Sequence, residues 1–120
     1  MYKIMVVDDA GFMRMTIKNH LTKAGYSDFI ECEDGQKAVE TYPTEKPDLV
    51  IMDITMPNMN GIEALRAISE VDSAAKVIMC SAMGQESMVM EAITLGALDF
   101  IVKPFKAERI VQTVAKVCPL

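Results

Sequence analysis

The sequence predicts a doubly wound α/β domain, with a five-stranded parallel β-sheet covered by helices on both faces, and three observations lead to that prediction. Five short apolar segments alternate with segments of helical periodicity from one end of the chain to the other. The strand-like segments are apolar at consecutive positions, which is typical of strands buried on both faces. The chain has 120 residues, 51% of them apolar, enough for one domain with one core. We therefore expect a single domain over residues 1–120.

The first two strands are predicted over residues 3–8 and 29–33. Charged residues alternate with apolar ones in the second strand, which favours a place at the edge of the sheet. The helical spacing between these strands ends before Gly25, a residue type well suited to the position after a helix C-terminus. A shorter helix follows the second strand, and we expect Pro43 and Pro47 to close it off.

Three further strands are expected over residues 48–53, 76–81 and 98–103. The first of these is the most continuous apolar run, and a loop over residues 55–61 leads from it into a helix. Another helix is predicted over residues 86–95. The last strand stops at Pro104, and a final helix follows it. This strict alternation of strand and helix favours a parallel sheet with right-handed crossovers.

Charge and composition argue against several classes of function. Seventeen acidic residues against twelve basic ones leave a net charge of −5, which is unsuited to a nucleic-acid partner. The apolar runs are far shorter than the roughly 20 residues that cross a bilayer, and the N-terminus has no secretory pattern. The three cysteines form no C-x-x-C motif and are expected to be reduced and mostly buried. We expect a cytoplasmic monomer without nucleic-acid or membrane partners.

Reactive side chains stand at the ends of four predicted strands. Asp8 and Asp9 follow the first strand, Asp53 ends the third, Ser81 ends the fourth and Lys103 ends the fifth. In an open parallel sheet the ligand crevice lies beyond the carboxyl ends of the strands, so these side chains are expected on one rim. With the strand order 2-1-3-4-5, which we take from the flavodoxin-like fold and do not derive, the three carboxylates share one pocket.

Three neighbouring carboxylates favour a bound cation. Two unit charges 4 Å apart interact by about 4 kcal/mol at an effective dielectric constant near 20, and Lys103 supplies only one positive charge. Because no His or Cys joins the cluster, Mg²⁺ fits better than Zn²⁺. Such a site suits phosphoryl transfer, in which a carboxylate can itself be the nucleophile. We predict Asp53 as the phosphoryl acceptor, with Asp8 and Asp9 holding the metal.

The residues at the strand ends resemble those of the receiver domains of two-component response regulators. The resemblance rests on Asp8–Asp9, on the stretch from Asp53 to Gly61, on Ser81–Ala82 and on Lys103–Pro104–Phe105. It extends over the whole chain to the stand-alone, CheY-type chemotaxis regulators, and we expect a free-standing domain of that kind. The fold that it implies is flavodoxin-like, and the function is that of a phosphorylation-controlled binding module.

The same resemblance implies roles for individual residues. Asp53 would accept a phosphoryl group from a histidine kinase. Mg²⁺ would be held by Asp9, Asp53 and the main-chain carbonyl of Thr55, with Asp8 acting through water. We expect no turnover of a separate substrate, only phosphorylation of the chain itself and its slow reversal.

The resemblance also implies that Ser81 and Lys103 contact the phosphoryl group, and it leaves the isomer of the Lys103–Pro104 bond open.

Two residues depart from the family pattern. Phe100 occupies the aromatic switch position, where CheY-type chains usually have tyrosine, and it has no hydroxyl to hydrogen-bond. Thr55 and Met83 stand two residues after Asp53 and Ser81, at positions that tune phosphoryl lifetime in the family. Because Met83 offers no hydrogen bond to an attacking water, we predict slow self-dephosphorylation.

The helix predicted over residues 86–95 carries apolar groups over more than the ~100° stripe that one buried face needs. We expect this helix, Phe100 and the last helix to form an output surface, with Val89 and Met90 against the partner. The partner expected for a chemotaxis regulator is the flagellar motor switch protein, and a phosphatase is a further partner. The alternative is a helix that is merely well buried.

Two other functions stay open: an intermediate of a phosphorelay, and a Mg²⁺-dependent phosphohydrolase that uses an aspartyl phosphate. The hydrolase is disfavoured because such enzymes usually carry an acid two residues after the nucleophile. Ala10 and Thr55 stand two residues after Asp8 and Asp53. Each acid alone also has a structural role open to it, such as capping the first helix. Their joint placement on one rim is what favours a site.

Overall fold

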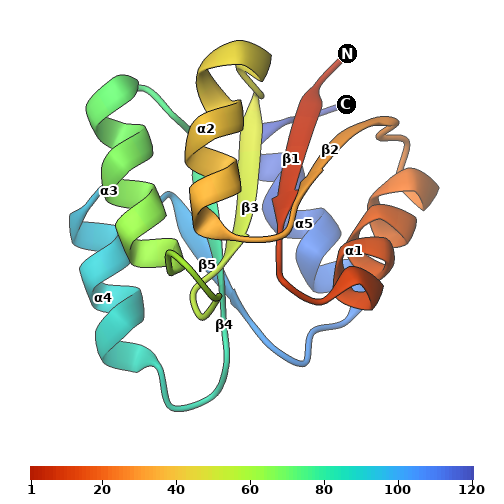
Figure 1. Ribbon diagram of the computed structural model, residues 1–120. Helices are drawn as coiled ribbons and strands as arrows, with labels where there is room; N and C mark the ends of the chain where they lie inside the picture. Colours follow the sequence, from red (N-terminus) through yellow and green to blue (C-terminus); the bar gives the residue numbers. More distant parts are fainter.

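The computed structural model describes residues 1–120 and confirms the predicted architecture. Five parallel strands form one sheet in the order β2-β1-β3-β4-β5, with helices on both faces (Figure 1). The strands are β1 (Lys3–Val7), β2 (Asp28–Cys32), β3 (Leu49–Asp53), β4 (Val77–Ser81) and β5 (Asp99–Val102). The helices are α1 (Gly11–Lys23), α2 (Gly35–Glu45), α3 (Gly61–Val71), α4 (Glu86–Thr94) and α5 (Ala107–Val117).

Side chains of the sheet alternate between two hydrophobic cores. On β3, Val50 and Met52 belong to the core under α2, α3 and α4, whereas Leu49 and Ile51 belong to the core under α1 and α5. The two groups of helices lie on opposite sides of the sheet (Figure 1). Because both faces of each central strand are covered, apolar residues are favoured at every position. This arrangement explains the continuous apolar runs in the sequence.

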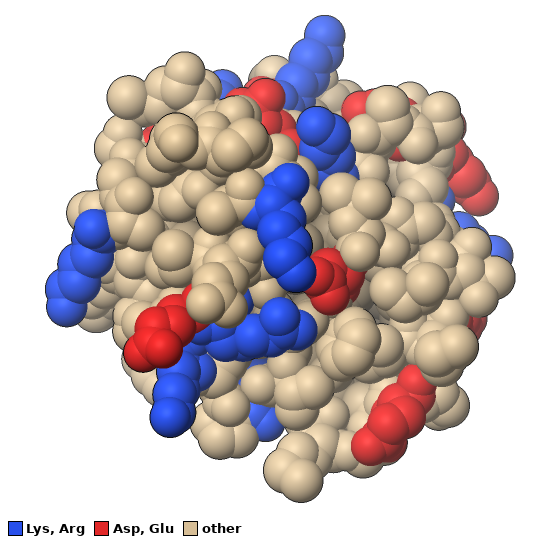
Figure 2. Space-filling model, turned by 180° about the vertical axis from the view of Figure 1, so that it is seen from behind, with Lys and Arg blue, Asp and Glu red and all other residues tan.

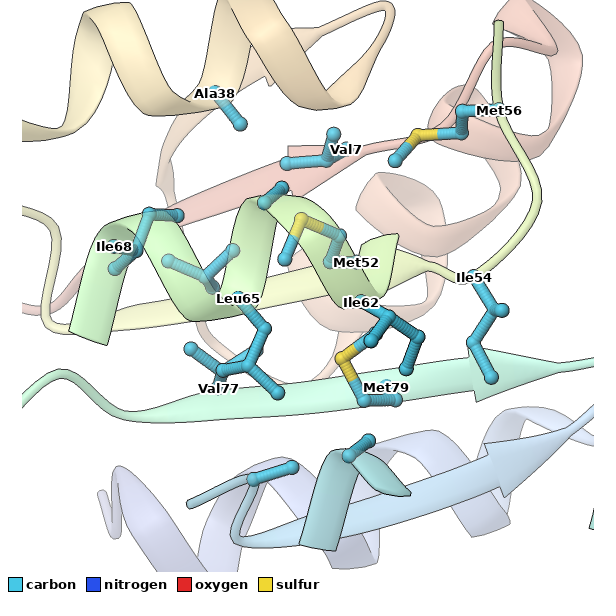
Figure 3. Close-up of a cluster of buried hydrophobic side chains, with 14 of the residues drawn as sticks. Val7, Ala38, Met52, Ile54, Met56, Ile62, Leu65, Ile68, Val77 and Met79 are labelled. Atoms are coloured by element: carbon cyan, nitrogen blue, oxygen red, sulfur yellow. The ribbon is translucent and has the colours of Figure 1, made fainter. Parts of the chain in front are cut away.

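The core under α3 extends to the end of the sheet where the candidate site lies. Leu65 and Ile68 of α3 point onto the strands, and Ile54 and Met56 fill the end of this core just beyond β3 (Figure 3). The start of α3 is fixed by a capping box. The Asn60 side chain accepts a hydrogen bond from the Glu63 N–H at 2.9 Å, and the Glu63 carboxylate accepts one from the Asn60 N–H at 3.1 Å.

Every predicted strand differs from the observed one by one residue at one or both ends, and the predicted end of α2 at Pro43 is wrong. Pro43 does not end α2 but lies inside it, and the helix runs on to Glu45. Pro43 stands in the last turn, where its missing N–H removes a single helical hydrogen bond. Lys46 follows the last helical residue, has a left-handed backbone conformation and donates its N–H to the Tyr42 carbonyl at 2.8 Å. Strand β2 also begins and ends one residue earlier than predicted, although its place at the sheet edge is confirmed.

The cysteines behave as the sequence predicts. All three are unpaired and buried. Burial raises the pKa of the Cys80 thiol to about 12, so this thiol stays protonated at neutral pH.

No helix has the length and apolar character needed to span a membrane. On the face seen in Figure 2, Lys and Arg side chains are interspersed with acidic groups and with uncharged surface. Basic and acidic side chains therefore share this face.

Candidate functional site

The structure brings the three predicted acids together at the carboxyl ends of β1 and β3. These strands are neighbours in the sheet, with Val7 paired to Met52, so the residues that follow them meet. Carboxylate oxygens of Asp8, Asp9 and Asp53 lie within 4.8 Å of one another. Asp8 is 2% exposed and Asp53 is 9% exposed, whereas Asp9 faces solvent. The site therefore has two buried acids and a third at its mouth.

Asp8 is held rigidly by its surroundings. One carboxylate oxygen accepts a hydrogen bond from the Ala10 N–H at 2.9 Å, and the other accepts one from Lys103 Nζ at 2.9 Å. Its carbonyl accepts a hydrogen bond from Arg14 Nη1 at 2.6 Å. The N-cap residue of α1 is Ala10, so neither Asp8 nor Asp9 caps that helix. The sequence does not single out Arg14, because its contact depends on the path of the turn between β1 and α1.

Lys103 reaches the acids from the end of β5, the edge strand that β4 separates from β3. It follows β5, and its Nζ lies 2.9 Å from Asp8 Oδ2 and 3.3 Å from Asp53 Oδ2. Its backbone N–H donates to the Ser81 carbonyl at 2.7 Å, and its bond to Pro104 is cis. The side chain of Lys103 therefore bridges two acids that stand on neighbouring strands.

Burial governs the protonation of this cluster. Burial raises the pKa of the Asp53 carboxyl, because the positive charge of Lys103 offsets the cost only in part and the charge of Asp8 adds to it. Burial also pulls the pKa of Lys103 down, but the hydrogen bond to Asp8 and the charge of Asp53 outweigh it, so the pKa is raised. Lys103 thus stays charged at neutral pH, and negative charge remains in excess.

The residues present fit a magnesium ion. The cluster offers only carboxylate oxygens, which are the ligands of a hard cation, and its excess negative charge favours a divalent one. Both oxygens of Asp8 are already hydrogen-bonded, which is compatible with the predicted role through water. Direct ligation by Asp9 and Asp53 stays a prediction. The part assigned to the Thr55 carbonyl stays a prediction.

The loop that leaves Asp53 folds back against the end of β3. The Gly61 N–H donates to the Ile54 carbonyl at 2.7 Å. A Cβ at position 61 would overlap the carbonyl oxygen of Asp53 and approach Ile54 Cα to 2.9 Å. Because only glycine allows this close approach, Gly61 fixes the backbone that carries the Asp53 carboxylate.

Ser81 lies on the same rim and also lines a neighbouring groove. It is buried, and no hydrogen bond joins its hydroxyl to Asp53 or Lys103. Ser81 lines an apolar groove of about 380 Å³ between α4 and β5, together with the half-buried ring of Phe100. The groove thus places the predicted switch aromatic beside a residue of the candidate site.

The two residues predicted on the output surface differ in exposure. Both Val89 and Met90 line the groove. Met90 is 65% exposed, whereas Val89 is 7% exposed and packs into the core. Ile93 is a further exposed apolar residue on α4. The expectation that some apolar groups of α4 face solvent is confirmed by Met90 and Ile93. Contact of Val89 and Met90 with a partner stays a prediction, and the burial of Val89 makes Met90 the more accessible of the two.

The structure adds Gln85 to the rim, a residue that no sequence pattern singles out. Its side-chain Nε2 donates to Thr55 Oγ1 at 2.8 Å, and its Oε1 accepts a hydrogen bond from the Ala82 N–H at 2.6 Å. Thr55 lies in the loop after β3, and Ala82 lies in the loop after β4. One side chain therefore joins two loops that meet only because β3 and β4 are neighbours.

A doubly wound parallel sheet with this strand order defines a flavodoxin-like domain, and its strand ends gather three acids, a bridging lysine and a hydroxyl into a candidate cation site. The model of the response regulator receiver domain matches residues 4–115. The chain belongs to this family, whose members are the response regulators of two-component systems.

Three known proteins illustrate the similarity. The chain is 56% identical to chemotaxis protein CheY of Bacillus subtilis, over 96% of each chain. It is 36% identical to sporulation initiation phosphotransferase F of the same organism, over 98% of this chain and 94% of that protein. Among solved structures, the CheX–CheY–BeF3–Mg complex from Borrelia burgdorferi matches with a TM-score of 0.92 and 36% identity, over 99% of this chain and 90% of that one.

Proposed function

We propose that this chain is a chemotaxis response regulator that accepts a phosphoryl group on Asp53 from a histidine kinase. The observation that supports this most directly is a nine-tenths buried carboxylate with two further acids within 4.8 Å and a lysine ammonium at 3.3 Å. Mg²⁺ would be held by Asp9, Asp53 and the Thr55 carbonyl, with Asp8 acting through water, and it would supply positive charge to the phosphoryl oxygens.

Each side chain of the site has a part in the transfer. The Asp53 carboxylate attacks phosphorus, an O–P bond forms, and the bond from phosphorus to the donor imidazole nitrogen breaks. Lys103 stays protonated and pairs with a phosphoryl oxygen, while Asp8 keeps its ammonium group in place. Ser81 donates a hydrogen bond to another phosphoryl oxygen after moving out of the groove. The product is an acyl phosphate on the chain itself, and no separate substrate is turned over.

The movement of Ser81 connects the site to the output surface. When Ser81 leaves the groove, the ring of Phe100 follows into the vacated space and reshapes the surface formed by α4, β5 and α5. Moving a two-state domain from mostly off to mostly on needs about 5.5 kcal/mol of differential interaction. Hydrogen bonds to the charged phosphoryl group supply part of this free energy, so partial activation without phosphate is expected.

We infer the binding partners of this chain from those of similar proteins. Similarity to chemotaxis protein CheY supports the flagellar motor switch protein as the output partner. The Borrelia CheY was solved with CheX, which supports a comparable partner, acting as a phosphatase, for this chain. The three buried free thiols suit a cytoplasmic protein, and we propose that it acts as a monomer.

Exposed apolar groups on α4 are expected to carry the contact with the partner. Replacing Met90 by serine should weaken binding of the beryllofluoride-loaded chain to the flagellar motor switch protein by about five- to tenfold, the loss typical of a central interface residue. Isothermal titration measures this, and phosphorylation by acetyl phosphate should stay unchanged. Met15→Ser removes an equally exposed methionine from α1 and serves as the control. Equal affinity of the Met90→Ser and Met15→Ser variants would contradict the proposed surface.

Phosphoryl lifetime is expected to depend on Met83, which is 80% exposed and lines the groove together with Ser81. A Met83→Glu variant places a carboxylate where it can orient and activate water, so it should lose its phosphoryl group several-fold faster than the wild type. The decay of the phosphorylated mass after removal of the phosphodonor gives the rate. Met83→Leu keeps the apolar character and should decay at the wild-type rate. A Met83→Glu half-life as long as that of the wild type would contradict the prediction of slow self-dephosphorylation.

A phosphorelay intermediate is the second candidate, and the similarity to sporulation initiation phosphotransferase F supports it. Rapid transfer from phosphorylated Asp53 to a second histidine phosphotransfer protein would favour the relay. Binding to a flagellar motor protein that depends on phosphorylation would favour the chemotaxis switch. A phosphohydrolase is disfavoured, because Ala10 and Thr55 stand where a general acid would follow Asp8 and Asp53.

A further inference from the structure

Gln85 stands at the start of α4, but its side chain does not cap that helix. It is the N-cap residue, yet its side chain makes no capping hydrogen bond. Instead the amide turns back over the rim, where Nε2 binds Thr55 Oγ1 at 2.8 Å and Oε1 binds the Ala82 N–H at 2.6 Å. Both ends of the amide are therefore committed to the two loops that border the acidic site.

One of these loops is anchored by main-chain hydrogen bonds, whereas the other is exposed. Thr55 lies between Asp53 and the capping box that starts α3, and the Gly61 N–H pins this loop to the Ile54 carbonyl at 2.7 Å. The loop from Ala82 to Gly84 is exposed and contains no helical or strand residue. Gln85 thus attaches an otherwise unsupported loop to an anchored one.

The two hydrogen bonds of Gln85 oppose the movement of Ser81 and Ala82 on which the proposed switch depends. Ser81 lines the groove beside Phe100 and makes no hydrogen bond to Asp53, and in the proposed switch it shifts toward the phosphoryl group on Asp53. Adjacent Cα atoms are about 3.8 Å apart, so a shift of Ser81 carries the Ala82 N–H with it. That movement stretches or breaks the 2.6 Å hydrogen bond to Gln85.

Resting on the proposed function, we propose that Gln85 is a positioning residue that latches the loop between β4 and α4 in its resting place through Ala82 and Thr55. Phosphorylation of Asp53 works against this latch. The latch lowers the population of the active conformation before phosphorylation and weakens the hold on the phosphoryl group after it. Gln85 thereby sets the threshold of the switch without touching the reacting atoms.

Binding of beryllofluoride with Mg²⁺ tests the latch, since this anion resembles a phosphoryl group in shape and charge. The Gln85→Ala variant should bind it about two- to tenfold more tightly than the wild type, the range expected for one neutral hydrogen bond. In the absence of beryllofluoride, the amide resonance of Ala82 and the ring resonances of Phe100 should already lie part of the way toward their bound positions. Gln112→Ala, the same change at an exposed position of α5, should leave affinity and spectrum unchanged.

The anchor gives a second, independent variant. Thr55→Val removes the hydroxyl but keeps the backbone carbonyl, and it should tighten beryllofluoride binding in the same direction. The double variant should gain little more than either single one, because both remove the same tie. Unchanged or weaker binding by Gln85→Ala, or fully additive effects of the two changes, would overturn the latch. If no chain, the wild type included, binds beryllofluoride, the proposed function itself fails.

Discussion

Replacing Lys103 by methionine is expected to destabilise the metal-free protein by about 2–3 kcal/mol at neutral pH, because it removes the only cation that contacts two buried carboxylates. Lys103 Nζ lies 2.9 Å from Asp8 and 3.3 Å from Asp53, and both acids are at least nine-tenths buried. Methionine keeps most of the length of the side chain, so the loss reports the charge. Urea unfolding in the presence of a chelator measures the free energy.

Magnesium should restore much of the lost stability. A divalent cation at the acids supplies the missing positive charge, so Mg²⁺ should raise the free energy of unfolding more in Lys103→Met than in the wild type. Lys106→Met, which alters an exposed lysine three residues along the chain, should respond as the wild type does. A Lys103→Met protein as stable as the wild type in chelator would show that the ion pairs do not balance the buried acids.

Replacing Gly61 by alanine is expected to cost about 2–3 kcal/mol of stability and to slow phosphorylation of Asp53. The added Cβ would overlap the Asp53 carbonyl oxygen, so either α3 or the end of β3 has to move. Such a shift displaces the backbone that carries the acceptor carboxylate and strains the 2.7 Å hydrogen bond from Gly61 to Ile54. Thermal unfolding and the rate of labelling by acetyl phosphate measure the two effects.

Gly11→Ala is the matched control for that substitution. Gly11 begins α1, and the nearest heavy atom to an added Cβ is Arg14 Nη2 at 3.5 Å, an ordinary contact with a flexible side chain. Its stability should change by no more than about 0.5 kcal/mol. Equal stability of the Gly61→Ala and Gly11→Ala variants would show that the close approach does not constrain the site.

The sequence predicts the site residues that lie at the carboxyl ends of the strands. A parallel sheet places every strand's carboxyl end on one edge, so the positions of Asp8, Asp53 and Lys103 along the chain suffice to predict that they meet. The order of the strands does not follow from these residues. It came from the likeness to a known fold, and without it the adjacency of β1 and β3 is one possibility among several.

What the sequence does not predict depends on the paths of turns and the directions of side chains. Gln85 joins Thr55 to Ala82 only because the loops after β3 and β4 run close together. Helical spacing shows that α4 is apolar over a wide arc, but it does not decide that Val89 packs inward while Met90 faces solvent. Pro43 shows the limit of a local rule, because a last helical turn tolerates the lost hydrogen bond.

The location of the acyl phosphate is the central claim, and intact mass spectrometry tests it most directly. After incubation with acetyl phosphate and Mg²⁺, the wild-type chain should gain the mass of one phosphoryl group, and the gain should disappear when a chelator replaces Mg²⁺. The Asp53→Ala chain should gain nothing under the same conditions. Equal labelling of the Asp53→Ala chain, or no labelling of the wild type, would contradict phosphoryl transfer to the buried carboxylate between Asp8 and Lys103.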